Sequence, residues 1–158
     1  MNHADFPLSK AEFDAIYSKV PRLTVEIIIK KDNSIYLTKR AIEPCRGQWH
    51  LPGGTVGFGE PVISAVKRVA KRELGISVDS VSNKGYIEYP SHYLNGLDSP
   101  VGLVFEVESY SGQIKPNREA AGHGWFKTVP ENMHADQDRF LIENNYLIED
   151  LSSRLKDA

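Results

Sequence analysis

Residues 53–76, which read GGTVGFGEPVISAVKRVAKRELGI, decide how this chain folds. From Glu60 to Leu74 the apolar residues recur at helical spacing, and Gly75 follows where a left-handed glycine commonly ends a helix. Residues 53–60 contain four glycines, and such a loop lets the backbone approach a phosphate closely beside a helix N-terminus. It does not end in the Gly-Lys-Ser/Thr of a P-loop. The stretch therefore predicts a glycine-rich loop that leads directly into an amphipathic helix.

Glu73 is the unusual residue of this predicted helix. On a helical wheel it falls about 20° from Val62 and Val66, so it lies inside the apolar face. A carboxylate on a core-facing stripe is costly unless a cation or a metal ion compensates its charge. We interpret Glu73 as an inward carboxylate that serves a metal or substrate site. The alternative is that the helix rotates slightly and that Glu73 reaches water at the last turn.

The rest of the sequence predicts one α+β domain over residues 1–158. Ser9 and Glu12 have the spacing of a capping box, which predicts a helix at about residues 10–19. Apolar residues from Phe140 to Leu155 predict a long terminal helix. β-branched segments and turn residues predict a hairpin of strands 22–31 and 35–39, and further strands at 48–51, 85–89, 101–107 and 124–127.

The composition excludes several classes of protein. The chain has 19 Lys and Arg against 21 Asp and Glu, for a net charge of −2, which argues against a dedicated nucleic-acid binder. The apolar run from Val25 to Ile29 is far too short to cross a bilayer, so no membrane partner is expected. The single Cys45 excludes an internal disulfide, and the N-terminus has no secretory signal pattern. We therefore expect a cytoplasmic location.

The loop and helix together resemble the signature of the Nudix hydrolases. That signature is Gly, five residues, Glu, seven residues, then Arg-Glu-hydrophobic-x-Glu-Glu-x-Gly-hydrophobic. The lead-in at residues 47–54 is also similar to that of the family. The resemblance implies a Nudix-like α/β/α sandwich, with a mixed β-sheet between the motif helix and the terminal helix. The matching positions are Gly54, Glu60, Arg68, Ala70, Glu73, Gly75 and Ile76.

The chain departs from the family pattern where Mg²⁺ is usually bound. Val69 and Arg72 replace two of the three glutamates in the Arg-Glu cluster. In this respect the chain resembles the GDP-mannose mannosyl hydrolases, which keep the last glutamate and bind a single Mg²⁺. That resemblance implies three metal ligands here, which are Glu73, the carbonyl of Gly53 or Gly54, and Glu119 in a later loop.

The same resemblance implies roles for other residues. Glu119 is expected to be a metal ligand or the general base, although an exposed loop carboxylate is the alternative. The mannosyl-hydrolase pattern has a catalytic His where this chain has Ala120 and an Arg where it has Thr55, which puts attack on a sugar carbon in doubt. With Glu119, we assign Glu60 and Arg68 to the catalytic set. We assign Arg40, Arg72 and Gly53 to substrate binding.

We therefore expect a hydrolase that uses Mg²⁺ or Mn²⁺ on a small-molecule nucleotide substrate. The substrate is expected to be a nucleoside diphosphate linked to another moiety, with a nucleotide sugar as the first candidate. Two alternatives stay open. A degenerate Nudix fold could bind a nucleotide and report it to a partner, and a pyrophosphatase could act on nucleoside triphosphates. The chain could also form a homodimer.

Several residues outside the signature carry further predictions. Glu26 interrupts a Val/Ile strand and faces either solvent or a cleft, and strand alternation favours solvent. Tyr86, Tyr89 and Tyr93 could stack on a base, but strand tyrosines more often simply pack. Four histidines have no metal-ligand spacing and are predicted to be surface or core residues, namely His50, His92, His123 and His134.

Overall fold

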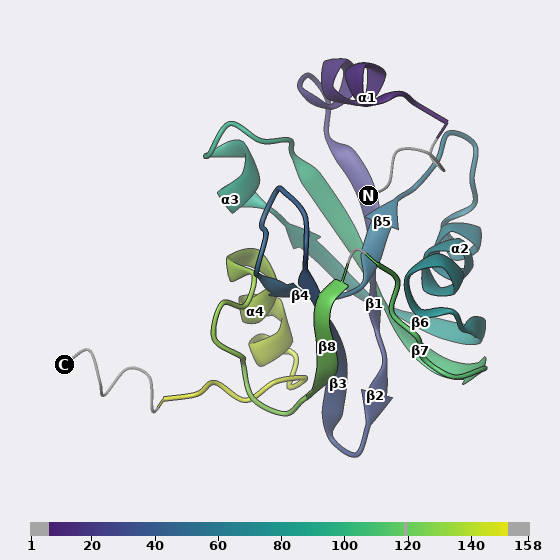
Figure 1. Ribbon diagram of the computed structural model, residues 1–158, viewed down its shortest axis with the longest axis vertical. Helices are drawn as coiled ribbons and strands as arrows, with labels where there is room; N and C mark the ends of the chain where they lie inside the picture. Colours follow the sequence, from purple (N-terminus) through teal and green to yellow (C-terminus); the bar gives the residue numbers. More distant parts are fainter. Residues whose placement is uncertain (1–6, 119, 152–158) are drawn as a thin grey trace.

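The computed structural model describes residues 7–118 and 120–151, which form two β-sheets with helices on both sides (Figure 1). Helix α2 lies on one side, and α3 and α4 lie on the other, while α1 lies at one end of the molecule. This arrangement confirms the predicted α+β sandwich. The helices span Lys10–Tyr17 (α1), Val62–Leu74 (α2), Pro90–Tyr93 (α3) and Ala135–Glu143 (α4).

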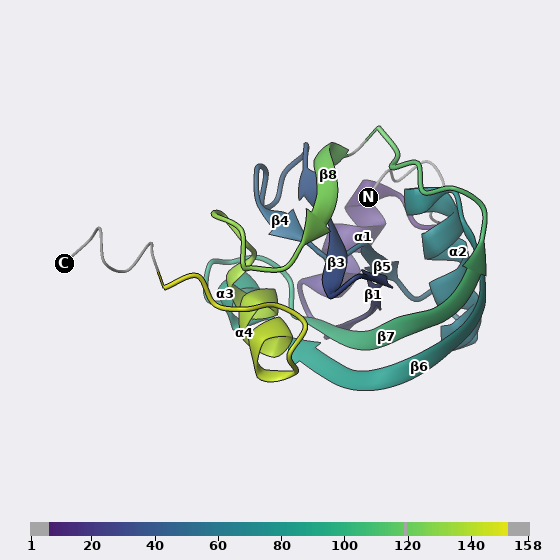
Figure 2. The same ribbon diagram turned by 90° about the horizontal axis from the view of Figure 1, so that it is seen from below.

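The first sheet is mixed, with strand order β5-β1-β7-β6. Strands β1 and β7 are parallel, whereas β5 pairs antiparallel with β1 and β6 pairs antiparallel with β7. Figure 2 shows β6 and β7 as long curved strands with α2 on their concave side. The strands span Arg22–Ile28 (β1), Gly53–Thr55 (β5), Ser77–Glu88 (β6) and Pro100–Ser111 (β7).

The second sheet is antiparallel and centres on β3, which pairs with β2, β4 and β8. Its last strand ends in Trp125 and Phe126, and Phe126 packs edge-on against Trp49 with ring centroids 4.7 Å apart. The strands span Lys30–Lys31 (β2), Ser34–Arg40 (β3), Trp49–His50 (β4) and Ala120–Phe126 (β8).

The predicted hairpin of two full strands was wrong. The chain does turn at Asp32 and Asn33, both of which have positive φ, but only Lys30 and Lys31 pair with β3. Strand β1 joins the other sheet because its residues 24–28 are all buried and need a neighbour on each side. The segment after Pro52 is likewise a strand, since β5 pairs with β1.

Local signals explain where most helices begin and end. The Ser9 side chain accepts from Glu12 N–H and the Glu12 side chain accepts from Ser9 N–H, so the capping box is present. Helix α2 follows Pro61 and ends at Gly75, whose φ of 70° is left-handed. The predicted long terminal helix was wrong, because α4 ends at Glu143 and the chain reverses at Asn145, which has a φ of 62°.

Two apolar clusters hold the sheets and helices together. One lies between α2 and the mixed sheet, where Val66, Val69 and Leu74 pack on strands β1, β6 and β7. The other lies beneath α4, where Leu141 and Leu147 pack against both sheets. Leu147 thus reaches the core from the segment after the helix, and Leu155 lies outside the described residues. In the described part of the chain, no helix has the length and apolar character needed to span a bilayer.

Candidate active site

A cavity of about 650 Å³ opens beside the glycine-rich segment. Its wall is formed by α1, β1, β5 and α2, together with the 41–47 loop, α3 and the start of α4. The volume lies within the range of roughly 300–1,000 Å³ that is usual for small-molecule sites. The structure brings most of the predicted site residues to this cavity, namely Arg40, Gly53, Gly54, Arg68, Arg72 and Glu73.

Glu60 does not line the cavity but holds Arg68, which does. The Arg68 guanidinium donates to both carboxylate oxygens of Glu60, at 2.8 and 2.9 Å, and to the carbonyl of Thr55 at 2.8 Å. Glu60 also accepts from Gly57 N–H at 3.0 Å. The hydrogen bond from Arg68 lowers the pKa of Glu60, so this carboxylate stays ionised. Together these bonds tie the glycine-rich segment to α2.

Glu73 lies in the last turn of α2, half-buried at the cavity wall. Its backbone carbonyl accepts from Asn117 N–H at 3.1 Å, which joins the loop before β8 to the end of the helix. Val69, at a position where the family has a glutamate, is buried and packs beneath Gly54. A Cβ added to Gly54 would lie 3.0 Å from Val69 Cγ2. The glycine therefore permits close contact between β5 and α2.

Arg40 reaches the cavity from strand β3, and Arg72 reaches it from helix α2. Arg40 ends β3 and donates from Nε to the carbonyl of Pro44, which fixes the 41–47 loop. Arg72 lies one residue before Glu73 on α2. Arg22 also lines the cavity, donating to Thr55 Oγ1 at 2.8 Å and to Asp98 Oδ2 at 2.6 Å. The Arg22 guanidinium thus contacts Thr55, which stands at the position where the mannosyl-hydrolase pattern has an arginine.

Glu26 is a cavity residue, and the prediction that it faces solvent was wrong. The residue is only 7% exposed and lines the cavity. Oε1 accepts hydrogen bonds from Tyr89 at 2.8 Å and from Thr24 at 3.0 Å. Burial raises the pKa of Glu26 to about 7, although these two hydrogen bonds act to lower it. The carboxyl can therefore take up or release a proton near neutral pH.

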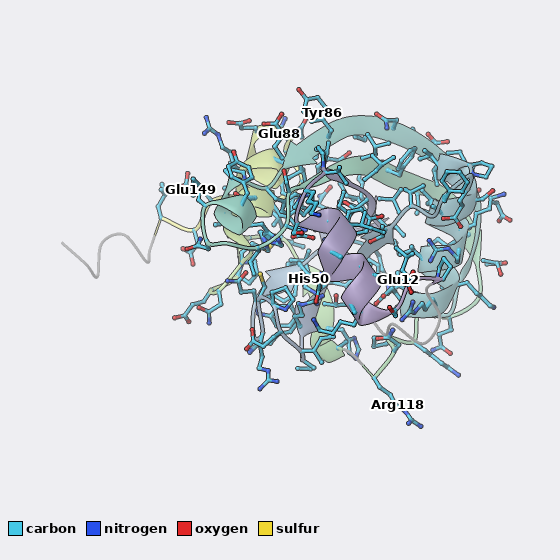
Figure 3. All side chains as sticks on the ribbon, turned by 90° about the horizontal axis from the view of Figure 1, so that it is seen from above. Glu12, His50, Tyr86, Glu88, Arg118 and Glu149 are labelled. Carbon is cyan, nitrogen blue, oxygen red and sulfur yellow. The ribbon has the colours of Figure 1, made fainter. Side chains whose placement is uncertain are left out.

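Tyr89 is held in place for this contact. Its hydroxyl accepts from Gln137 Nε2 at 2.9 Å, and Gln137 Oε1 accepts from Leu51 N–H at 2.7 Å. Tyr89 is buried at the cavity wall, whereas Tyr86 and Tyr93 are 61% and 51% exposed. Figure 3 shows Tyr86 projecting from the outer side of β6. Of the three tyrosines, Tyr89 is the one that contacts a cavity carboxyl.

Cys45, His92 and His134 also meet at the cavity wall. Cys45 Sγ lies 3.8 Å from His92 Nε2, and His92 Nε2 lies 3.1 Å from His134 Nε2. The other ring nitrogen of His92 lies 3.1 Å from Asp98 Oδ1. Both histidines are buried, but the sequence did not indicate that they meet a cysteine.

Glu119 lies outside the described residues, so its expected roles stay predictions. Its neighbour Arg118 is exposed and points outward at the periphery of the molecule, whereas His50 lies toward the centre (Figure 3). Ala120, where the mannosyl-hydrolase pattern has a catalytic histidine, lines the cavity. His50 Nδ1 donates to the Leu51 carbonyl, 2.7 Å away, and burial lowers the pKa of His50 to about 4.

Sequence reasoning missed Glu26, Tyr89 and the Cys45 cluster as parts of the site. For Glu26 a signal was present, because a carboxylate in a Val/Ile strand that becomes buried must face a polar cavity or a partner. Cys45 and His92 are 47 positions apart, and His92 and His134 are 42 apart. No local spacing reports such a cluster.

Comparison with known proteins agrees with this fold. The NUDIX domain model matches residues 20–143. The low-salt glycan biosynthesis protein Agl8 of Haloferax volcanii is 32% identical over 147 residues, which cover 89% of this chain and 94% of that protein. An ADP-ribose pyrophosphatase of Methanocaldococcus jannaschii is 36% identical over 100 residues, which cover 63% of this chain and 58% of that protein.

Solved structures agree as well. A MutT NUDIX hydrolase from Burkholderia pseudomallei superposes with a TM-score of 0.71 at 30% identity, covering 78% of this chain and 97% of that chain. A MutT protein from Methanosarcina mazei shares the fold with a TM-score of 0.62 at 22% identity, covering 78% of this chain and 95% of that chain. With the family model matching most of its length, this chain belongs to the NUDIX hydrolase family.

Proposed function

We propose that this chain hydrolyses a nucleoside diphosphate linked to another moiety, with Mg²⁺ or Mn²⁺ as cofactor and a nucleotide sugar as the first candidate substrate. The observation that carries the proposal is that one cavity of about 650 Å³ holds the Glu73 carboxylate, the glycine pair and the guanidinium groups of Arg40 and Arg72. A diphosphate needs this combination of cations and metal-binding oxygens.

The residues at the end of α2 fit a hard divalent cation. Mg²⁺ prefers oxygen ligands and keeps positions for water and substrate phosphate. The Glu73 carboxylate and a carbonyl of Gly53 or Gly54 would hold the ion, with Glu119 as the further candidate. When bound, the cation would neutralise charge that develops on the phosphate oxygens. Val69 and Arg72 supply no oxygen, so substrate phosphates must complete the shell.

Cationic side chains would position the diphosphate. Arg40 and Arg72 come from different elements, and Arg22 donates to Thr55 and lies over the Phe13 ring of α1. A guanidinium binds phosphate oxygens in a planar, two-pronged geometry. Glu60 and Arg68 act as positioning residues, since their bonds to Gly57 and Thr55 fix the glycine-rich segment.

A cavity carboxyl would activate the attacking water. Glu119 is the first candidate for the general base. Glu26 is the second, because it lines the cavity and has a pKa of about 7. Ala120 cannot act as base at the position of the mannosyl-hydrolase histidine. We therefore infer attack of water on phosphorus, which gives a nucleoside monophosphate and a sugar phosphate.

The relatives support the class of substrate. ADP-ribose, named for one of them, is a nucleoside diphosphate linked to a sugar. The name of another relative refers to glycan biosynthesis, in which activated sugars are the donors. A screen of nucleotide sugars, dinucleotides and nucleoside triphosphates with Mg²⁺ or Mn²⁺ tests the proposal. Preferred turnover of nucleotide sugars supports it, whereas preferred turnover of triphosphates would replace it with the pyrophosphatase alternative.

A further inference from the structure

We propose that Cys45, His92 and His134 form a binding site for a borderline-soft divalent cation of the Zn²⁺ type. The site lies on the cavity wall formed by the 41–47 loop, α3 and the start of α4. Figure 1 shows α3 and α4 on the side of the molecule opposite α2, which carries Glu73. The two candidate metal sites share no residue, although both line the same cavity, and this one does not depend on which nucleotide the enzyme hydrolyses.

The donor atoms have the spacing that such a cation requires. Sulfur and nitrogen of Cys45 and His92 are 3.8 Å apart, the two Nε2 atoms are 3.1 Å apart, and the three donors lie within 4.8 Å of one another. A tetrahedral Zn²⁺, with bonds of about 2.0–2.1 Å to nitrogen and about 2.3 Å to sulfur, holds such atoms roughly 3.4–3.6 Å apart. Shifts of up to roughly 1.2 Å would bring all three donors to these separations.

The donor types match Zn²⁺ and not Mg²⁺. A thiolate and two imidazoles are soft or borderline ligands, which bind Zn²⁺ strongly and Mg²⁺ poorly. The set also corresponds to the three-ligand sites in which zinc keeps one open position. Because Cys45, His92 and His134 all line the cavity, the open position faces it. A water molecule or a substrate oxygen can occupy that position.

Each histidine has a carboxylate beside its second ring nitrogen. His92 Nδ1 lies 3.1 Å from Asp98 Oδ1, and His134 Nδ1 lies 4.0 Å from Asp136 Oδ2. Ser91 Oγ donates to Asp136 and holds it in place. Metal-bound histidines usually donate their other N–H to such a carboxylate, which fixes the ring and strengthens the ligand. His134 Nδ1 accepts from Asp136 N–H at 3.2 Å, so binding of a cation at Nε2 would require the ring proton to leave Nε2.

The backbone at Cys45 supports a specific role for this side chain. Cys45 has a φ of 65°, in the left-handed region that residues with a Cβ rarely adopt. Such a conformation is strained and persists where the surrounding structure imposes it. Here it directs the half-buried thiol toward two buried histidines. The strained backbone at Cys45 is consistent with a site that needs its thiol beside the two histidines.

Metal titration of the full chain tests the proposal directly. The chelator-stripped protein is titrated with Zn²⁺ against a colorimetric competitor, and with Co²⁺ while the near-ultraviolet thiolate-to-Co²⁺ charge-transfer band is recorded. We expect one ion per chain and a charge-transfer band. Cys45→Ser should abolish the band and weaken Zn²⁺ binding by about 100-fold or more, beyond the roughly 10–100-fold typical of losing an outer hydrogen-bond partner.

Matched variants separate this site from its alternatives. His134→Asn should weaken binding, whereas His123→Asn, at an exposed position on β8, should leave binding unchanged. Because Cys45 lies in a loop, its variant keeps the test valid even if His134→Asn fails to fold. Stoichiometric Zn²⁺ binding that survives Cys45→Ser, or that is lost in Glu73→Gln, would overturn the proposal in favour of the α2 site. Failure of the stripped wild-type chain to bind Zn²⁺ or to show the band would overturn it as well.

Discussion

Gly53 lies directly against the carboxyl group of Glu26, so closely that a Cβ on Gly53 would be 2.2 Å from Glu26 Oε2. The two residues are register partners on the antiparallel strands β5 and β1. Gly102 borders the same carboxyl from β7, where a Cβ would be 2.8 Å from Glu26 Oε1. A cavity carboxyl thus occupies a slot that two glycines leave open. Gly53, the first glycine of the glycine-rich stretch, therefore has a packing role as well as a proposed substrate-binding role.

Gly53→Ala should disturb this slot. The added methyl group would meet Glu26 Oε2 and the Val25 carbonyl, 2.7 Å away, and backbone atoms cannot easily give way. Overpacking of this kind costs about 1–3 kcal/mol, so we expect a lower free energy of unfolding and a loss of activity. Chemical denaturation measures the first effect. Gly57→Ala is the matched control, since its Cβ would make ordinary contact at 3.6 Å. Equal stability of the two variants would contradict the packing argument.

Glu26→Gln should change how stability depends on pH. Burial raises the pKa of Glu26 to about 7 from a usual 4.5, so the folded chain holds this proton more tightly than the unfolded chain. The stabilisation that this raised pKa gives the folded state is complete below about pH 4.5 and is lost as the pH rises through about 7. Glutamine removes this dependence. The stability of the variant relative to the wild type should therefore rise by about 2 kcal/mol between roughly pH 5 and 8. A constant difference between the two proteins would show that Glu26 titrates normally.

Glu60 and Arg68 should be energetically coupled. The Arg68 guanidinium donates to both carboxylate oxygens of Glu60, at 2.8 and 2.9 Å. Glu60 also accepts from Gly57 N–H, and Arg68 also donates to the Thr55 carbonyl. In a double-mutant cycle with alanine at both positions, we expect a coupling energy of about 0.5–1.5 kcal/mol. The exposed pair of Arg139 and Glu143 on α4 serves as control and should show a smaller coupling. Additive effects of Glu60→Ala and Arg68→Ala would mean that the contact does not hold the glycine-rich segment.

Much of the fold follows from local signals, and what was missed depends on distant partners. Ser9 with Glu12, and Gly75 after Leu74, correctly gave helix ends because capping involves neighbours in sequence. The pairing of β1 with β7 could not be seen, because the register of strands far apart in sequence is decided by which faces become buried. The terminal apolar residues fit a helical pattern, yet the chain turns at Asn145 so that Leu147 can reach the core.

The same distinction holds for the candidate site, where residues close in sequence could be predicted together and residues from distant segments could not. Glu73, Arg68 and the glycine pair lie within one continuous motif, so their sequence spacing already placed them together. Glu26 was assigned to solvent because alternation along one strand does not reveal the cavity beside it. Cys45 and His92 come from segments that only tertiary folding joins. A site whose residues come from several distant segments can therefore be identified only once the structure is known.

Glu73→Gln should abolish metal-dependent hydrolysis while the fold survives. The amide keeps the shape of the side chain but loses the charge that holds Mg²⁺. Since Glu73 is half-buried at a helix end, we expect little change in thermal stability and a loss of rate of about 100-fold or more, which exceeds the usual effect of outer-shell changes. Glu88→Gln, at an exposed position on β6 (Figure 3), is the matched control. Full turnover by a folded Glu73→Gln variant would remove Glu73 from the metal site.

The position of bond cleavage tests the central claim most directly. Hydrolysis of the preferred nucleotide sugar in ¹⁸O-labelled water shows which atom the water attacks, because the label stays on that atom. With Ala120 in place of a histidine base, we predict attack on phosphorus, so mass spectrometry should find the label in a phosphate group of the nucleoside monophosphate or of the sugar phosphate. Label found only in a free sugar, released together with an unlabelled nucleoside diphosphate, would contradict the account and indicate attack on carbon.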